Sequence, residues 1–350
     1  MHSIQLNNTK ILQVIDRLEV GGAERVFLDL TSLLLNENIQ VDTLLISARG
    51  PLFGCIDQRA GKLCLNRKWK FDPFKMLECA RICSRYKIVH VHMRHTYAYV
   101  RLAQIISFKK FKIIFHDHFG ESEMSFRSSF TLKGFFKPKY YIGVSQHLVH
   151  WATIKLNIAN SRVFLLKNTI IPSDGSIKLK SNKDLLMISN IRPIKNIELA
   201  VGLANHLRRK LTIYGNAPAN EYSENILKLI KASGYVELIQ GENNVQRFLK
   251  NYSLALHTAH SETGPLVLME YLARGLPFLA HAVGEVAEVL IDEIPECFVD
   301  SLDIAKWEEK ISYLQNTAPS PEKLMSLFNK YFGAKKYIEN CLNIYQQILA

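Results

Sequence analysis

Long apolar stretches are missing from this chain of 350 residues. We find no run of about 18 or more apolar residues, which argues against a membrane-spanning helix. The first residues lack the basic and then apolar layout of a secretory signal peptide. Six cysteines are present, but they form neither a CxxC pair nor a dense framework. We therefore expect reduced thiols in a cytoplasmic protein.

Low-complexity tracts are absent as well, and the apolar share of 48% is ordinary for a globular protein. The composition therefore gives no reason to expect disorder. The length exceeds what one hydrophobic core usually serves, so we expect two domains.

Acidic residues are scarce in the first half only. Residues 1–168 hold 25 lysines and arginines against 12 acidic residues, whereas residues 169–350 hold 19 against 20. This asymmetry suggests an anionic partner for the first half, either nucleic acid or the anionic face of a membrane. A solvated basic surface without a partner is the alternative.

Short β-branched runs alternate with helical stretches along the first half, which predicts βαβ units and a parallel sheet. The expected strands are Lys10–Asp16, Val41–Ser47, Ile88–His92, Lys112–His116 and Tyr140–Ser145. The expected helices lie near Glu24–Leu35, Pro73–Arg85, Tyr97–Phe108 and Gln146–Lys155.

The alternation restarts after a polar stretch over 171–183, which is the best candidate for a linker. The expected strands that follow are Leu185–Ser189, Lys210–Tyr214, Val236–Gln240, Leu254–His257 and Phe278–Ala280. The expected helices lie near Asn196–Leu207, Glu221–Ala232, Val245–Lys250 and Leu266–Arg274.

We therefore predict an α/β protein with two Rossmann-like, doubly wound domains that face each other across a cleft. The first domain spans 1–170 and the second spans 184–320. Two closing helices over 321–350 are expected to pack back toward the first domain.

The segment from Ser261 to Pro277 carries the clearest chemistry. Glu262 and Glu270 bracket a turn that runs into an apolar helix, with Pro265 at its start and Gly275 at its end. A carboxylate inside an apolar helix needs a partner, and the free amides at the helix start offer an anion site beside it. One region could thus hold a phosphate and a polyhydroxylated group, the combination found in a sugar nucleotide.

With these residues placed, the chain resembles the GT-B-fold glycosyltransferases of family 4, a large retaining family. The resemblance covers nearly the whole length. Four segments in the order of the family carry it: the glycine-rich turn Asp16–Arg25, the basic donor motif Ile188–Asn196, the pair Glu262 and Glu270 with the spacing of the EX7E signature, and Val283–Glu288.

The resemblance implies donor-binding roles on the second domain. Glu270 is expected to accept from the ribose hydroxyls, and Glu262 to touch the transferred sugar. Lys195 and Arg192 are expected to bind the departing diphosphate. In the commonest pattern an arginine stands where Asn190 does, so Arg192 is the candidate to replace it. The distal phosphate would lie on the amides around Gly264, Pro265 and Leu266.

The resemblance also implies residues on the first domain. Gly21 and Gly22 would let the backbone approach the ligand closely. A histidine after the fourth strand faces the transferred sugar and the acceptor in this family, and either His116 or His118 fits that place. Each of these residues also has a plain structural interpretation, as a turn glycine or a loop histidine.

His90 and His92 point to one face of a strand, which could suit zinc. We nevertheless predict no metal and no other cofactor, since similar histidine-rich strands occur in the family without one. The chain also has no Asp-x-Asp motif, which metal-dependent transferases of the other major fold carry. The basic and aromatic mixture over 126–141 suits a membrane interface, or else an ordinary helix and strand that pack their aromatic rings inward.

We therefore expect a retaining glycosyltransferase that moves a hexose or N-acetylhexosamine from a UDP- or GDP-linked sugar to a glycan. By resemblance, the acceptor is carried on polyprenyl diphosphate, as in cell-surface polysaccharide synthesis of the O-antigen or capsule type. The enzyme would act from the cytoplasm, peripherally on the anionic inner face of the membrane. The resemblance further implies reaction on one face of the sugar, with the departing diphosphate taking the acceptor proton.

Three alternatives remain open at this point. The first is an enzyme of the same fold, either a nucleotide-sugar epimerase or a transferase with a soluble acceptor. The second is a catalytically inactive partner subunit. The third is a basic nucleic-acid-binding protein, although no helix-turn-helix or aromatic-basic RNA motif stands out, so our prediction names no nucleic acid as a partner.

Overall fold

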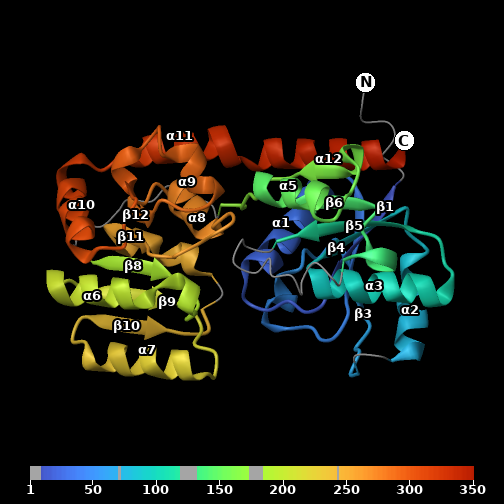
Figure 1. Ribbon diagram of the computed structural model, residues 1–350, viewed down its shortest axis with the longest axis horizontal. Coiled ribbons are helices and arrows are strands. Elements are labelled where there is room, and N and C mark those ends of the chain that lie inside the picture. Colours follow the sequence, from blue (N-terminus) through green and yellow to red (C-terminus); the bar gives the residue numbers. More distant parts are fainter. Residues whose placement is uncertain (1–8, 70–71, 119–131, 173–183, 243) are drawn as a thin grey trace. The chain divides into compact units, whose positions relative to one another are not determined.

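The computed structural model describes residues 9–69, 72–118, 132–172, 184–242 and 244–350. The chain forms two compact units (Figure 1). The first comprises Met1–Ile170 together with Ala334–Ala350, and the second comprises Ile171–Gly333. Most of the expected linker, residues 173–183, and part of the basic and aromatic segment, residues 126–131, lie outside the described residues.

The first unit is built on a parallel sheet of seven strands in the order β3-β2-β1-β4-β5-β6-β7. Its strands are β1 Lys10–Ile15, β2 Gln40–Leu45, β3 Gly61–Cys64, β4 Ile88–His92, β5 Lys112–Asp117, β6 Tyr140–Gly143 and β7 Val163–Leu165. The central strands are buried on both faces, which is why their sequences are nearly continuous runs of β-branched and aromatic residues.

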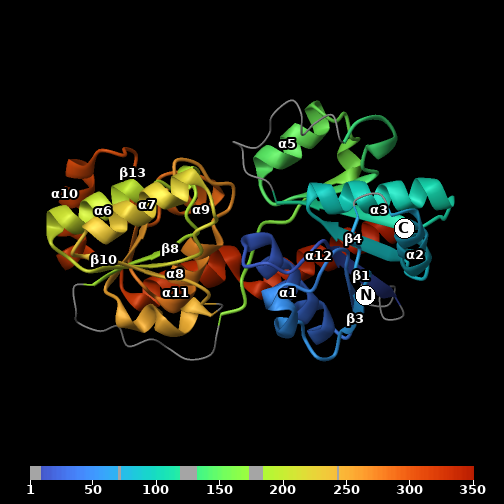
Figure 2. The same cartoon turned by 90° about the horizontal axis from the view of Figure 1, so that it is seen from below.

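Helices cover both faces of this sheet, as Figure 2 shows. The helices are α1 Gly22–Asn36, α2 Pro73–Cys83, α3 Arg94–Ser107, α5 Gln146–Ile154 and α12 Ala334–Leu349. Short 3-10 turns are η1 Pro51–Cys55, η3 Gly134–Phe136 and η4 Asn160–Arg162. One buried cluster joins α1 and α12 to one sheet face. A second cluster joins α2, α3 and α5 to the other.

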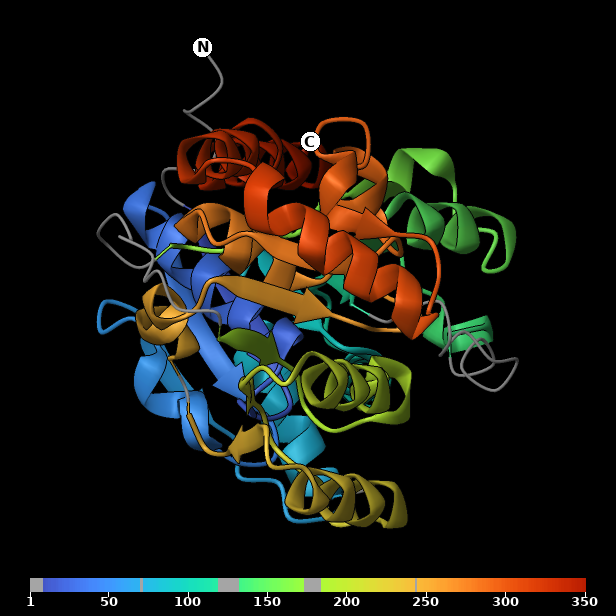
Figure 3. The same cartoon turned by 90° about the vertical axis from the view of Figure 1, so that its left-hand side faces the viewer.

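The second unit holds a parallel sheet of six strands in the order β10-β9-β8-β11-β12-β13. Its strands are β8 Leu185–Ile188, β9 Leu211–Tyr214, β10 Val236–Ile239, β11 Leu254–His257, β12 Phe278–His281 and β13 Phe298–Val299. Its helices are α6 Ile197–Leu207, α7 Glu221–Ala232, α8 Leu266–Arg274, α9 Glu285–Leu290, α10 Ile304–Thr317 and α11 Pro321–Phe332. The 3-10 turns are η5 Pro193–Lys195, η6 Val245–Asn251 and η7 Pro295–Cys297. Figures 2 and 3 show the strands between two layers of helices.

Both sheets reverse their strand order once. The chain turns from one side to the other between β1 and β4 in the first unit, and between β8 and β11 in the second. Ligands of open parallel sheets bind at such switch points, outside the carboxyl ends of the strands. The fold therefore marks one edge in each unit as the place for a site.

The predicted class of two doubly wound α/β domains is confirmed. The helix expected near Val245–Lys250 is present as a 3-10 helix over Val245–Asn251. The place of Pro265 was wrong, because it caps α8 from outside instead of occupying its first turn. The two closing helices separate, since α11 belongs to the second unit and α12 to the first. No helix in the described part of the chain is long and apolar enough to cross a membrane.

Candidate functional site

The switch point of the second unit lies where β8 and β11 end. The chain after β8 makes the 3-10 turn η5, which ends at Lys195. Thr258, just after β11, holds this turn by placing its hydroxyl 3.0 Å from the carbonyl oxygen of Lys195. The amide of His260 donates to the carbonyl of Ile194 at 2.8 Å. The two loops are therefore fastened to each other, and their side chains share one edge of the sheet.

Glu262 and Lys195 form an ion pair at this edge. The imidazole of His257, the last residue of β11, lies with Nε2 3.3 Å from the same carboxylate oxygen. Burial raises the pKa of the Glu262 carboxyl, but the hydrogen bond from His257 and the charge of Lys195 outweigh it and lower the pKa to about 2. Glu262 is thus a carboxylate at any physiological pH, held between two cationic or hydrogen-donating groups.

The start of α8 follows this pair directly. Gly264 and Pro265 lead into the helix, which begins at Leu266. The helix is tied to β8 because the Ile188 amide donates to the Tyr271 hydroxyl at 3.2 Å. Glu270 lies in the second turn of α8 and is half-buried. The positive end of the helix dipole therefore adjoins the Glu262 carboxylate.

The segment Val283–Glu288 packs closely against the backbone of Glu262 at Gly284. Its φ is +81°, and a Cβ there would lie 2.8 Å from the carbonyl oxygen of Glu262. The next residue, Glu285, donates its amide to the Thr263 carbonyl at 2.9 Å. A side chain at position 284 would push against the backbone that carries Glu262, so glycine is required there.

The two remaining donor candidates differ in their surroundings. Asn190 uses its side-chain oxygen to accept from the Asn216 amide at 2.9 Å, which joins the loops after β8 and β9. Arg192 is exposed, and while its backbone carbonyl accepts from the Lys195 amide at 2.9 Å, its guanidinium has no hydrogen-bond or ion-pair partner within the described residues. Asn190 therefore has a structural task, while the guanidinium of Arg192 is available to an anion.

In the first unit, Gly21 and Gly22 lie where β1 leads into α1, at the switch point. The φ of Gly21 is −158°, which any residue adopts. A Cβ on Gly21 would meet only the end of the Glu24 side chain, at 2.4 Å. The protein itself thus makes little demand for glycine here, and a close ligand remains the stronger reason for it.

A row of polar side chains runs up the sheet face covered by α1. Thr31 donates its hydroxyl to the Phe27 carbonyl at 2.8 Å and so accepts from the Gln13 amide nitrogen at 3.1 Å. The Gln13 oxygen then faces Nε2 of His92 at 2.9 Å. Because that oxygen can only accept, Nε2 of His92 carries the proton.

The same reasoning extends to the end of the row. Nδ1 of His92 lies 3.0 Å from Nε2 of His118. Burial, followed by the nearby histidines, holds the pKa of His92 well below its ordinary value, so this ring is neutral. Its Nδ1 is therefore an acceptor and Nε2 of His118 is the donor. Burial also lowers the pKa of His118 to about 3, which leaves its Nδ1 without a proton.

A second row begins on α12. The Tyr345 hydroxyl lies 2.6 Å from Nδ1 of His90, and Nε2 of His90 lies 3.0 Å from Nδ1 of His116. His90 and His116 are fully buried, and burial lowers the pKa of both. Nε2 of His116 has no hydrogen-bond partner among the described residues. His116 and His118 lie together, with ring centroids 4.1 Å apart.

His90, His92 and His116 place ligand nitrogens within 4.8 Å of one another, so this cluster could hold a metal ion. Most of these nitrogens already have hydrogen-bond partners, either in one another or in Tyr345, Gln13 and His118. Binding zinc would break those contacts. The predicted absence of a metal therefore stays a prediction.

Sequence reasoning did not single out several residues of these edges. His257 is the last residue of a predicted strand, as His92 is, and a polar residue at the carboxyl end of a strand indicates a possible site residue. Gln13 is a polar residue inside a buried strand, which is also a readable signal. Tyr345 is 255 residues from His90, and no local pattern links the two.

Two family models match consecutive parts of the chain. Residues 20–173 match the model described as Glycosyltransferase Family 4. Residues 173–326 match the model described as Glycosyl transferases group 1. Together they cover residues 20–326, which include every site residue predicted from the sequence.

Individual relatives agree with the family models. A Haemophilus influenzae protein named an uncharacterized glycosyltransferase is 24% identical over 183 residues, which are 49% of this chain and 51% of the relative. N-acetyl-alpha-D-glucosaminyl L-malate synthase of Bacillus anthracis is 27% identical over 139 residues, which are 38% of this chain and 36% of that protein. The chain thus matches about half or less of the length of these relatives.

Solved structures match over nearly the whole length. The structure of Anabaena HepE in complex with UDP and glucose has a TM-score of 0.80 at 13% identity, covering 96% of this chain and 99% of HepE. A glycosyltransferase from Rickettsia africae has a TM-score of 0.77 at 16% identity, covering 98% and 99%. At these identities the likeness establishes the fold.

Proposed function

This chain belongs to the family 4 glycosyltransferases of the GT-B fold, and on that premise we propose that it is a retaining enzyme which moves a hexose or N-acetylhexosamine from a nucleotide diphosphate sugar to a glycan. The observation that carries the proposal is the ion pair of Glu262 and Lys195 beside the start of α8. A phosphate-binding helix end, a cation and a fixed carboxylate occur together there.

Each group at this edge has a task in the proposed reaction. Lys195 and Arg192 neutralise the diphosphate as it gains charge, which lowers the barrier to its departure. The free amides at the start of α8, from Gly264 to Leu266, hold the distal phosphate. Glu270 accepts from the ribose hydroxyls.

Glu262 faces the transferred sugar. Its depressed pKa keeps it negative, so it favours positive charge on the sugar ring in the transition state. Lys195 exchanges part of its contact with Glu262 for the incoming diphosphate. Binding the donor therefore frees the carboxylate to meet the sugar.

The first unit supplies the acceptor side. His118 is partly exposed and His116 is fully buried behind it, so we assign the contact with the ligand to His118 and its support to His116. Nδ1 of His118 accepts a hydrogen bond from a sugar or acceptor hydroxyl. The acceptor oxygen bonds to the anomeric carbon as the bond to the diphosphate breaks, and the acceptor proton passes to a departing phosphate oxygen.

The wider assignments follow from charge. The basic first half suits an acceptor carried on a lipid diphosphate and an anionic membrane surface. The donor is a UDP- or GDP-linked sugar, and the reaction needs no metal. HepE was solved with UDP and glucose, which supports a nucleotide-sugar donor of this kind.

Kinetics of two variants test the site. We expect Glu270→Ala to raise the donor KM, because it removes a ground-state contact. We expect Glu262→Ala to lower kcat more than it weakens donor binding, because its contact strengthens in the transition state. Glu309→Ala, which removes an exposed glutamate on α10 outside the motifs, is the matched control. Unimpaired kinetics in both site variants would remove the assignment, and wild-type protein that turns over no nucleotide sugar would indicate an inactive partner subunit.

A further inference from the structure

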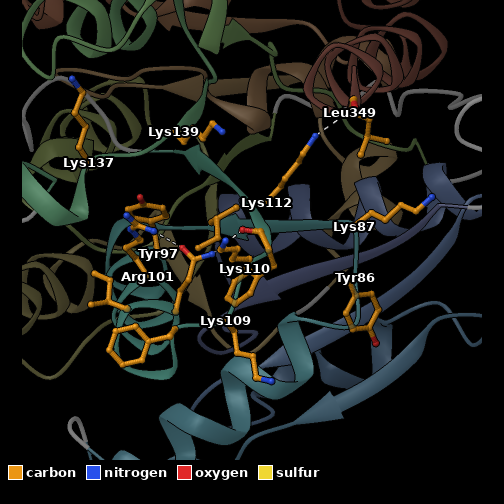
Figure 4. A pocket seen from close by; sticks show the side chains of 15 residues that line it. Tyr86, Lys87, Tyr97, Arg101, Lys109, Lys110, Lys112, Lys137, Lys139 and Leu349 are labelled. Carbon is orange, nitrogen blue, oxygen red and sulfur yellow. Dashed lines mark hydrogen bonds between the residues drawn. The ribbon is translucent and has the colours of Figure 1, made fainter.

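A cavity of about 890 Å³ opens on the first unit, away from the switch point. It lies at the amino-terminal ends of the strands, next to Lys112 at the start of β5 and Lys139 just before β6. The end of α3 and Leu349 of α12 complete its wall (Figure 4). The histidine rows lie toward the opposite ends of the same strands, so this cavity is separate from the acceptor side.

Positive charge dominates the wall. Seven of its 15 residues are lysine or arginine and none is acidic; the seven are Lys87, Arg101, Lys109, Lys110, Lys112, Lys137 and Lys139. No ion pair involves any of them within the described residues. Figure 4 shows the labelled side chains arriving from separate segments around the hollow.

Several of these cations are fixed in place without being neutralised. Lys112 donates to the Ile348 carbonyl at 2.6 Å, and Arg101 donates to the Phe135 carbonyl at 2.9 Å. Lys109 and Lys110 are exposed, and their ammonium groups have no partner in the described part of the chain. Gathering like charges in one hollow costs free energy that a bound anion would return.

Large apolar side chains stand beside the cations. Phe108 lines the cavity and is 90% exposed. It ends α3 in the left-handed conformation, with φ +56°, a conformation that costs a non-glycine residue about 1–2 kcal/mol. Phe135 is 83% exposed and Ile106 is 43% exposed. Exposed rings next to lysines are typical of a surface that meets lipid headgroups, whereas a free phosphate needs only the cations.

We propose that this cavity binds the phosphate headgroup of an anionic lipid and docks the first unit on the membrane. The inference deepens the membrane part of the proposed function and depends on it for its biological setting. Lys112 and His116 are four residues apart on β5, about 13 Å along the strand. An acceptor held at the carboxyl end of this sheet would therefore react away from the docked edge, which suits an extended lipid-linked glycan.

Vesicle sedimentation without donor or acceptor tests the cavity alone. Vesicles of phosphatidylcholine, with and without phosphatidylglycerol, are mixed with wild type and with the double variant Lys109→Glu, Lys110→Glu. Each basic residue near an anionic surface strengthens binding about fivefold, so losing two should weaken binding to the anionic vesicles at least about thirty-fold. Binding to pure phosphatidylcholine should be weak for both proteins.

The control is Lys335→Glu, Lys336→Glu, which makes the same change in charge at two exposed residues at the start of α12. We expect it to retain most of the binding. Equal loss in both double variants would show a diffuse charge effect and overturn the cavity as the site. Unchanged binding in the Lys109, Lys110 variant would overturn it as well. Unchanged thermal midpoints would exclude misfolding.

Phe108→Ser separates a lipid from a free phosphate compound, since it keeps the charge. We expect it to weaken binding to the anionic vesicles. If it binds like wild type, and soluble glycerol phosphate releases the protein from vesicles, the cavity belongs to a free phosphate ligand and the lipid assignment is wrong. Sedimentation measures no sugar transfer, so a negative result with vesicles does not affect the assignment of the donor site. Likewise, unimpaired kinetics in the donor-site variants would not affect the result with vesicles.

Discussion

As the pH is lowered, the first unit should unfold at a higher pH than the second, because the first unit buries neutral histidines. His90, His92 and His116 are fully buried. Burial lowers the pKa of all three from the ordinary value of 6.5. The unfolded chain therefore takes up protons below about pH 6.5 that the folded unit does not bind. Stability is present in full above that pH and is lost as the pH falls below it.

The size of the effect follows from four depressed pKa values, those of the three fully buried histidines and of their partly exposed neighbour His118. Each histidine lowers the free energy of unfolding by about 1.4 kcal/mol per pH unit once the pH is below 6.5. Between about pH 7.5 and pH 5.5 the four together remove about 5 kcal/mol. A domain of this kind is stable by about 5–15 kcal/mol, so the loss is a large part of the total.

Hydrogen exchange measured by mass spectrometry is the assay, because it reports each unit separately. Peptides from β4 and β5 should lose protection steeply between about pH 7.5 and pH 5.5, after correction for the intrinsic exchange rate. Peptides from β8 and β9, which contain no histidine, are the internal control. His90→Gln should reduce the loss of protection per pH unit by about a quarter, since one of four depressed histidines is removed. The reasoning would be refuted if protection against exchange depended on pH equally in both units, or equally in wild type and His90→Gln.

Two substitutions in the first unit give further expected outcomes. Asp117→Ala should cost about 3–5 kcal/mol in urea unfolding, because the buried Asp117 carboxylate pairs with Arg94 at 2.8 Å; a loss below about 1 kcal/mol would contradict this, since surface ion pairs contribute that little. Gln13→Leu should leave Nε2 of His92 without an acceptor, so that the hydrogen bonds no longer fix which ring nitrogen of His118 carries the proton. We expect this variant to lower kcat with little change in donor KM. An unchanged pH profile and kcat in this variant would show that the row has no influence on transfer.

The positions of the main strands along the chain were predictable because each is a compact β-branched run between turn residues. The elements that escaped prediction are short or atypical. Strand β13 has only two residues, and β3 begins with glycine and lysine at the sheet edge. Helix α10 carries its buried residues at helical spacing, among them Trp307, Ile311 and Leu314, so the sequence does contain a pattern that indicates this helix.

The site was predictable where one motif holds its parts together. The helix from Leu266 to Arg274 was predicted with the bounds that the structure has. The ion pair of Lys195 with Glu262 joins residues 67 positions apart, and only the parallel sheet brings them to one edge. The same limit applies to the contact of Tyr345 with His90, because α12 returns to the first unit from the end of the chain.

Thermal-shift measurement with UDP, GDP, ADP and CMP, each with and without a chelator, tests the central claim most directly. A ligand that binds only the folded protein raises the unfolding midpoint by mass action. We expect one nucleoside diphosphate to raise the midpoint, no effect of the chelator, and loss of the shift in Lys195→Ala. No shift with any nucleotide, or an equal shift in Lys195→Ala, would contradict the donor site described at the end of β8.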